Sequence, residues 1–96
     1  MLRKADALAL NENDNVAVSL RELNKNEKAL VIRGNEKIEV EIIDKIPYGH
    51  KFSLFNIKKG DYIIKYGEII GIATSDIPKG AHVHVHNVKG LRAGEK

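Results

Sequence analysis

The amino-acid sequence predicts one small all-β domain built from short strands and hairpins. Several short runs are rich in β-branched side chains or alternate apolar with polar residues, and both patterns are typical of strands. Glycine, asparagine and proline stand between these runs and indicate turns. No stretch of about 11 residues or more shows a convincing helical period. At 96 residues, the chain can bury one modest core but cannot enclose a deep cleft on all sides.

The amino-terminal segment begins with a short apolar run, residues 5–10, which five polar residues follow at 11–15. Four of these five are Asn or Asp, whose side chains close turns through their own hydrogen bonds, so we expect a turn there. Residues 16–20 then alternate larger apolar residues with Ala and Ser. This pattern favours a half-buried strand, and a short helix is the alternative.

A β-hairpin is predicted in the next part of the chain. Residues 28–33 and 36–43 flank the pair Gly34-Asn35, which is a good turn sequence. The second run places isoleucine and valine on one face and lysine and glutamate on the other. We therefore expect its charged face to be solvated.

The carboxyl-terminal half contains a second predicted hairpin. Residues 62–66 and 68–73 are two β-rich runs separated by Gly67. A last strand that is rich in histidine follows, and residues 90–96 are polar with two glycines. The domain is therefore expected to span residues 1–89 and to be followed by a polar tail at 90–96.

One turn sequence recurs along the chain. Each copy has an apolar residue, a variable residue, Lys and then Gly or Asn, and each leads into a β-rich run; the copies begin at Leu23, Ile57 and Ile77. Asn26 takes the place of glycine in the first copy, and Asn is the other residue that best tolerates a left-handed backbone. The unequal spacing predicts reuse of one turn within a single domain and argues against a solenoid of stacked repeats.

Composition limits the chemistry that this chain can perform. There is no cysteine, so disulfides, thiolate nucleophiles and cysteine-bound metal sites are excluded. The net charge of +3 is spread along the chain without a basic block, and no nucleic-acid motif is present. No apolar run is long enough to span a membrane, and the start of the chain does not resemble a signal peptide. We expect a cytoplasmic protein that binds neither nucleic acid nor membrane.

Three of the four histidines alternate with valine near the end of the chain. On a β-strand, His82, His84 and His86 would share one face, while Val83 and Val85 would anchor the other. Neutral imidazole is a common ligand of divalent metals, and two neighbours on one strand face can converge on one ion. Histidine can also transfer a proton or contact an anion. The alternative is an exposed strand face on which the histidines have no chemical role.

Two loops carry further candidate residues. Pro47 and Gly49 interrupt the strand pattern, so a loop presents His50 and Lys51, and lysine can hold a carboxylate or a phosphate. The alternative is an ordinary solvated turn.

The second loop joins the two β-rich runs of the carboxyl-terminal half. It places Lys65 and Tyr66 beside Glu68, where the lysine could hold a substrate carboxylate. The alternative is a hairpin turn with an ion pair that faces outward.

Three ordered motifs resemble the amino-terminal SAF domain of the altronate/galactarate dehydratase family. They are Ile-Pro-Tyr-Gly-His-Lys-Phe-Ser-Leu at 46–54, Ile-Lys-Tyr-Gly-Glu-Ile-Ile-Gly at 64–71 and His-Val-His-Val-His-Asn-Val at 82–88. The likeness runs over essentially the whole chain. It implies a β-clip fold, which is a small all-β unit of folded-over hairpins. It also implies the dehydration of sugar acids such as altronate or galactarate, usually with a divalent metal such as iron.

The resemblance also implies a larger partner, because many members join this module to a much larger catalytic domain. We expect the chain to be the small subunit or amino-terminal module of a sugar-acid dehydratase. It would contribute one wall of a shared site, and the partner would hold the metal ion mainly through its own ligands. The expected residues are His50, His84 and His86 for catalysis, Lys51, Lys65, Tyr66 and Asn87 for the carboxylate-bearing substrate, and His82, His84 and His86 for metal.

Other functions remain open. The small subunit of sulfolactate sulfo-lyase is a close relative that eliminates sulfite in place of water. A substrate-binding or lid module without chemistry is a second alternative, and a protein that only carries a metal is a third. Whether the chain forms a homo-oligomer is not indicated by its sequence.

Overall fold

The computed structural model describes residues 4–91, and it contains nine strands and no helix in that range. The strands are β1 (Ala7–Ala9), β2 (Val16–Ser19), β3 (Lys28–Arg33), β4 (Glu36–Glu41), β5 (Lys51–Ser53), β6 (Tyr62–Lys65), β7 (Glu68–Ala73), β8 (His82–Val83) and β9 (Val88–Gly90). The all-β prediction is confirmed. No helix in the described range is long and apolar enough to cross a membrane.

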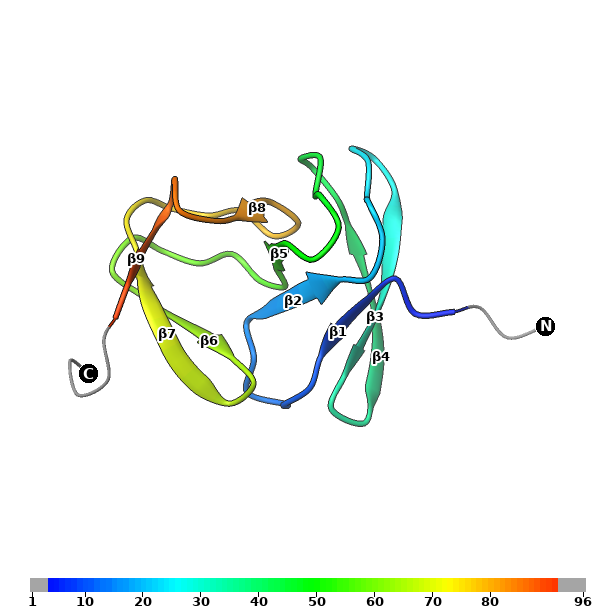
Figure 1. Cartoon of the computed structure of the whole chain (residues 1–96), viewed down its shortest axis with the longest axis horizontal. Coiled ribbons are helices and arrows are strands. Elements are labelled where there is room, and N and C mark those ends of the chain that lie inside the picture. The colour runs from blue at the N-terminus through cyan, green and yellow to red at the C-terminus, as the bar shows by residue number, and fades with distance from the viewer. Residues whose placement is uncertain (1–3, 92–96) are drawn as a thin grey trace.

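The strands form two sheets. The larger has the order β4-β3-β1-β2-β5-β8 and the smaller has the order β6-β7-β9. All pairings are antiparallel except that of β1 with β3. In Figure 1, β3 and β4 lie at one end of the molecule and the smaller sheet at the other, with β5 and β8 between them. The short strands β5 and β8 therefore lie where the two sheets approach each other.

Most predicted elements form as expected. Residues 11–15 make a turn, and residues 16–20 contain the strand β2, so the helical alternative is wrong for this segment. The predicted hairpin is the β3–β4 pair, with Gly34 at φ +56° in its turn. On β4, Val40 is buried while its charged neighbours Glu39 and Glu41 are exposed, as the alternation predicts.

The larger sheet packs one face over the first hydrophobic core. Alanines supply much of that face, and the bulk comes from larger residues of β5 and the loops. The buried members are Ala7, Ala9, Ala17, Leu23, Ala29, Val31, Val40, Ile42, Ile46, Phe52 and Leu54. Small side chains on the strands let the loops fold close against the sheet, and this packing removes their large side chains from water.

A second core joins the two sheets. Val16 and Val83 come from the larger sheet, Ile63 and Ala73 from the smaller one, and the loop residues Ile57, Ile77 and Ala81 complete the cluster. Val83 is fully buried here. The strand that carries His82 is therefore fixed in place by an apolar side chain on its opposite face.

Two polar side chains attach the β6–β7 hairpin to the larger sheet. The buried carboxylate of Asp14 accepts hydrogen bonds from the backbone N–H groups of Tyr66 (2.9 Å) and Gly67 (2.8 Å). Both turn residues have positive φ, at 54° and 76°. The side-chain amide of Asn15 accepts from Ile64 N–H and donates to Tyr62 O, each at 2.8 Å. These contacts satisfy backbone groups at the edge strand β6.

The recurring turn occurs four times in the structure, once more than the sequence comparison found. The additional copy begins at Ile46. In each copy, the residue that completes the motif has a positive φ: Asn26 (78°), Gly49 (78°), Gly60 (92°) and Gly80 (86°). The apolar first residues pair through backbone bridges, Leu23 with Ile46 and Ile57 with Ile77.

These paired turns delimit a repeated unit that spans residues 19–50 and again residues 53–81. Each copy contains a turn, a hairpin (β3–β4 or β6–β7) and a second turn. Ser19 donates its hydroxyl to Pro47 O, and Ser53 donates its hydroxyl to Pro78 O, at the equivalent position. The backbone N–H groups of Gly49 and Gly80 donate to the carbonyls of the same two serines. Residues 19–81 therefore contain two tandem copies of one small unit, and β1, β8 and β9 lie outside it.

The structure corrects the predicted histidine strand. β8 ends at Val83, and residues 84–87 form a bend and turn, so His82, His84 and His86 do not lie on one continuous strand face. Val83 is buried as expected, but Val85 is 82% exposed and anchors nothing. The pairing of β7 with β9 extends through Gly90, which was expected to begin the polar tail, and residues 92–96 lie outside the described range.

Candidate functional site

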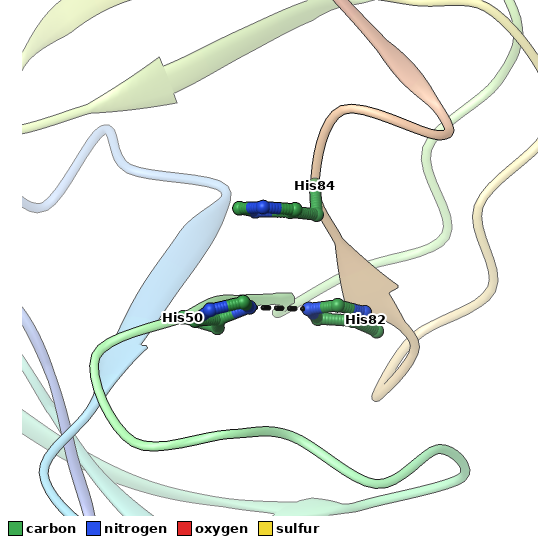
Figure 2. A group of neighbouring side chains, drawn as sticks. All are labelled: His50, His82 and His84. Carbon is green, nitrogen blue, oxygen red and sulfur yellow. Dashed lines mark hydrogen bonds between the residues drawn. The ribbon is translucent and has the colours of Figure 1, made fainter.

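Three imidazoles converge at the β5–β8 end of the larger sheet, and they belong to His50, His82 and His84 (Figure 2). One ligand-capable nitrogen from each ring lies within 4.8 Å of those of the other two. All three residues are partly buried and remain accessible from outside. The cluster thus takes two residues from the predicted histidine run and one from the loop before β5.

Strand pairing explains why His50 joins the group. β5 and β8 are antiparallel, with Lys51 opposite Val83 and Phe52 opposite His82. The next position in the same register places His50 opposite His84, and their ring centroids are 4.3 Å apart and nearly parallel. Residues directly opposite each other across a pair of strands share a face of the sheet.

Asn87 holds the loop that carries His84. Its side-chain oxygen accepts a hydrogen bond from His84 N–H (3.0 Å), and its side-chain nitrogen donates to His82 O (2.8 Å). Asn87 is 7% exposed, so both contacts are largely shielded from water. The geometry gives Asn87 a role in positioning the two histidines, and the substrate contact expected from the sequence stays a prediction.

A hydrogen bond links two of the three rings. His50 Nδ1 and His82 Nε2 are 2.9 Å apart, so one nitrogen carries the proton and the other accepts it. Two protonated rings could not keep this contact because both nitrogens would then be donors. In Figure 2, these two rings meet edge to edge, and the His84 ring lies above them in a nearly parallel plane.

The electrostatic environment favours neutral imidazoles. Burial lowers the pKa of His82 below its usual value of 6.5, and the neighbouring imidazoles add to this effect while Asp44 opposes it. The pKa of His84 is also lowered, first by desolvation and then by the positive charges of His50 and Lys51. Neutral imidazole is the form that binds metals and accepts protons.

The fourth histidine lies at the margin of the cluster. The His86 ring is 5.3 Å from that of His82 and tilted by 32°, and its nitrogens are not among those that converge. The nitrogens that converge belong to His50, His82 and His84, and the expected metal set of His82, His84 and His86 stays a prediction. A catalytic contribution from His86 stays a prediction.

Of the two candidate lysines, Lys51 lies near the histidines and Lys65 lies near Lys51. Lys51 lines a cavity of about 190 Å³ together with His84, and the pKa of its ammonium is lowered by burial and by the charge of Lys65. The Nζ atom of Lys65 lies 4.9 Å from the centroid of the Tyr66 ring. Tyr66 is about half exposed in the β6–β7 turn, and within residues 4–91 no hydrogen bond or ring contact joins it to the histidines.

The three convergent residues fit a divalent metal by their chemistry. Imidazole nitrogen suits iron, zinc and nickel, and two nitrogen ligands of one tetrahedral ion lie about 3.3 Å apart. The three nitrogens lie within 4.8 Å of one another, so an ion that bound all three would draw the rings closer together. Three imidazoles leave further positions for ligands from outside the cluster.

The sequence held one signal for the missing third residue. His50 follows the Ile46–Gly49 turn just as Ala81 follows the turn that begins at Ile77, so the strands after the two turns occupy equivalent places in the repeat. Equivalent strands that pair would bring His50 opposite the histidine run. The turn at Ile46 has Tyr48 where the other copies have lysine, and this difference hides the repeat in the sequence.

A family model that describes the altronate/galactarate dehydratase SAF domain matches residues 5–91. The chain belongs to this family. The identification from the three sequence motifs is thereby confirmed, and the two-sheet all-β structure agrees with it. The histidine cluster, Lys51 and Asn87 all lie within the matched part of this SAF domain.

Curated relatives of the SAF domain include both long and short proteins. Altronate dehydratase of Bacillus subtilis (strain 168) is 43% identical over 82 residues, which are 85% of this chain but 16% of the relative. Galactarate dehydratase (L-threo-forming) of Escherichia coli (strain K12) is 34% identical over 76 residues, covering 79% of this chain and 14% of the relative.

A third relative is close to this chain in extent. (2R)-Sulfolactate sulfo-lyase subunit alpha of Chromohalobacter salexigens is 39% identical over 62 residues, which are 65% of this chain and 66% of the relative. The SAF domain thus spans about one sixth of the dehydratases that it resembles and most of the sulfo-lyase subunit.

Proposed function

We propose that this SAF domain is the histidine-bearing module of a lyase that eliminates water next to a carboxylate, as the altronate and galactarate dehydratases do by name. In this proposal, it supplies one wall of a site that a larger catalytic partner completes, in the cytoplasm. The observation that carries the proposal is the convergence of His50, His82 and His84 at a partly open position. The dehydratase relatives support a larger partner, because the matched segment is only 16% of the length of one of them.

Each candidate side chain has a role in this proposal. Lys51 and Lys65 balance the charge of the substrate carboxylate, on which negative charge builds as the neighbouring proton is removed. His84 or His50 accepts or returns a proton, since neutral imidazole is the form that the surroundings favour at His84. His82 and Asn87 keep the other two rings in position through the contacts already described.

The proposal includes a divalent metal, iron or a similar ion, held by His50, His82 and His84 together with ligands from the partner. When bound, such an ion would supply a Lewis acid for the oxygen that leaves or for the enediolate. Without the ion, the histidines still provide a base, and Lys51 and Lys65 still provide positive charge beside the substrate carboxylate. Metal binding by this chain is thus a separate and directly measurable part of the proposal.

Sulfolactate sulfo-lyase is the second candidate function. The specific observation in its favour is the relative of C. salexigens, a named subunit of which this chain covers 66%. Sulfite would then leave in place of water. Both reactions need the same carboxylate contacts and the same proton transfer, so the histidine cluster serves either one.

The proposal can be tested by co-expressing the chain with the large lyase chain of the same genome. The complex is assayed with altronate, galactarate and (2R)-sulfolactate, and the keto-acid product and sulfite are measured. We expect turnover of one of these acids. His84→Ala is expected to lower kcat by at least 100-fold, whereas Lys37→Ala, on the exposed edge strand β4, leaves it within twofold of the wild type.

The same experiment separates catalysis from simple binding. If the module only binds substrate or acts as a lid, His50→Ala and His84→Ala raise KM and leave kcat nearly unchanged. Full activity of the double variant at saturating substrate would contradict a catalytic role for the cluster. Titration of the isolated chain with Zn²⁺ or Co²⁺ tests the metal separately.

A further inference from the structure

A cavity of about 190 Å³ opens beside the histidine cluster. It is lined by Lys51 from β5, Ile70 from β7, Val88 and Gly90 from β9, and by His84 and Val85 from the loop between β8 and β9. We propose that this cavity is a subsite for the anionic end of a small organic acid, a carboxylate or sulfonate carried on a short aliphatic stem. The link to catalysis rests on the proposed function, but the binding itself requires neither partner nor metal.

The charge around Lys51 supports an anionic ligand. Within residues 4–91, no carboxylate lies within ion-pair distance of its ammonium, whereas Arg21, Arg33 and Lys45 have such partners. The charged neighbours that act on it are cationic, chiefly Lys65. A half-buried ammonium without a counter-ion is costly, and an anion that enters the cavity would remove that cost.

The walls of the cavity indicate what accompanies the anionic group. Ile70, Val85 and Val88 are aliphatic, so the space around Lys51 offers few hydrogen bonds to a hydroxyl-rich molecule. The volume corresponds to about six water molecules, at about 30 Å³ for each. A carboxylate or sulfonate on a stem of three or four carbon atoms fits this space, and a longer acid would extend out of its open side.

The position of His84 gives the subsite a direction. Its side chain belongs both to the cavity lining and to the convergent imidazoles. An acid whose charged end contacts Lys51 therefore presents its next carbon atoms toward His84 and His50. In a reaction next to a carboxylate, this is where the proton is removed.

The binding test uses the isolated chain, treated with a chelator, at low salt. Backbone amide NMR shifts are followed during titration with propionate, ethanesulfonate and the neutral isostere propionamide. We expect saturable shifts at cavity residues with both anions, with a Kd on the order of 1–10 mM. Propionamide should produce no saturable shifts, because it lacks the charge that Lys51 recognises.

Two charge-matched variants identify the residue responsible. Lys51→Met removes the cavity ammonium, and we expect it to weaken propionate binding at least tenfold. Lys89→Met removes a lysine that is exposed on β9 between the lining residues Val88 and Gly90, and we expect binding within twofold of the wild type. If Lys51→Met does not fold, the pKa of the Lys51 ammonium in the wild type, read by NMR of labelled lysine, should rise when propionate binds.

Three results would overturn the inference. They are the absence of saturable shifts with both anions, equal binding of propionamide, or propionate binding by Lys51→Met within twofold of the wild type. An unchanged Lys51 pKa at saturating propionate would have the same meaning. None of these results depends on a partner or on turnover. The proposed subsite can therefore be refuted while the proposed lyase function stands, and the lyase function can be refuted while the subsite stands.

Discussion

Replacement of Asn87 by alanine should release the loop that carries His84. The substitution removes two hydrogen bonds, one to His84 N–H and one to His82 O, at a residue that is 7% exposed. A shielded backbone group that loses its partner costs about 1–3 kcal/mol, so we expect a loss of about 2–4 kcal/mol. A domain of this size has a free energy of unfolding of about 5–14 kcal/mol, so the effect is large.

Urea unfolding measures this loss. With a slope of about 1 kcal/mol per molar urea, the midpoint of Asn87→Ala should fall by about 2 M or more. The matched control is Asn56→Ala, since Asn56 accepts one hydrogen bond from Lys79 N–H (2.9 Å) in an exposed turn and should cost about 0.5–1 kcal/mol. Asn87→Asp keeps the acceptor for His84 but opposes His82 O with a second oxygen, so it should also be destabilised. Equal losses in Asn87→Ala and Asn56→Ala would refute the reasoning.

Two further predictions concern backbone strain and pH. Gly80 has φ +86°, and an added methyl group would lie 2.0 Å from Glu41 O, so Gly80→Ala should cost about 3–5 kcal/mol. The control is Gly60→Ala, at φ +92° with no atom within 4 Å of the added methyl group, and it should cost about 1–2 kcal/mol. Equal losses of stability in the two variants, measured by urea unfolding, would contradict the predicted clash with Glu41 O. The folded-state pKa values of His82 and His84 lie below the usual 6.5, so the unfolded chain binds more protons as the pH falls through that value. The free energy of unfolding should therefore have its full value above pH 6.5 and decline below it. A His82→Gln/His84→Gln double variant should lose less stability over the same pH range in urea unfolding. An unchanged dependence of its stability on pH would argue against the lowered pKa values of the two histidines.

The β3–β4 hairpin could be predicted from sequence because each of its strands has one buried face. Val40 and its exposed neighbours Glu39 and Glu41 on β4 show how alternation reports burial directly. Residues 16–20 were ambiguous because five residues are too few to separate a period of 2 from one of 3.6. Pairing with β1 and β5 decides that segment, and such contacts between distant parts of the chain are not visible in a local pattern.

The histidine site was only partly predictable for a similar reason. His-Val alternation suggests one strand, but the Asn87 side chain competes for the backbone of His82 and His84 and ends the strand at Val83. The third imidazole, from His50, is distant in sequence and enters through the β5–β8 register. Local periodicity thus pointed to the histidines but could not show which three of them converge.

The tandem arrangement of the fold places the imidazoles at the junction between its two copies. The first copy ends at His50, and the second copy is followed immediately by His82 and His84. Neither half carries all three histidines by itself, so a polypeptide with a single copy of the unit could not form the imidazole cluster. The imidazole cluster thus depends on the contact between the two halves, and it forms only once both halves have folded against each other.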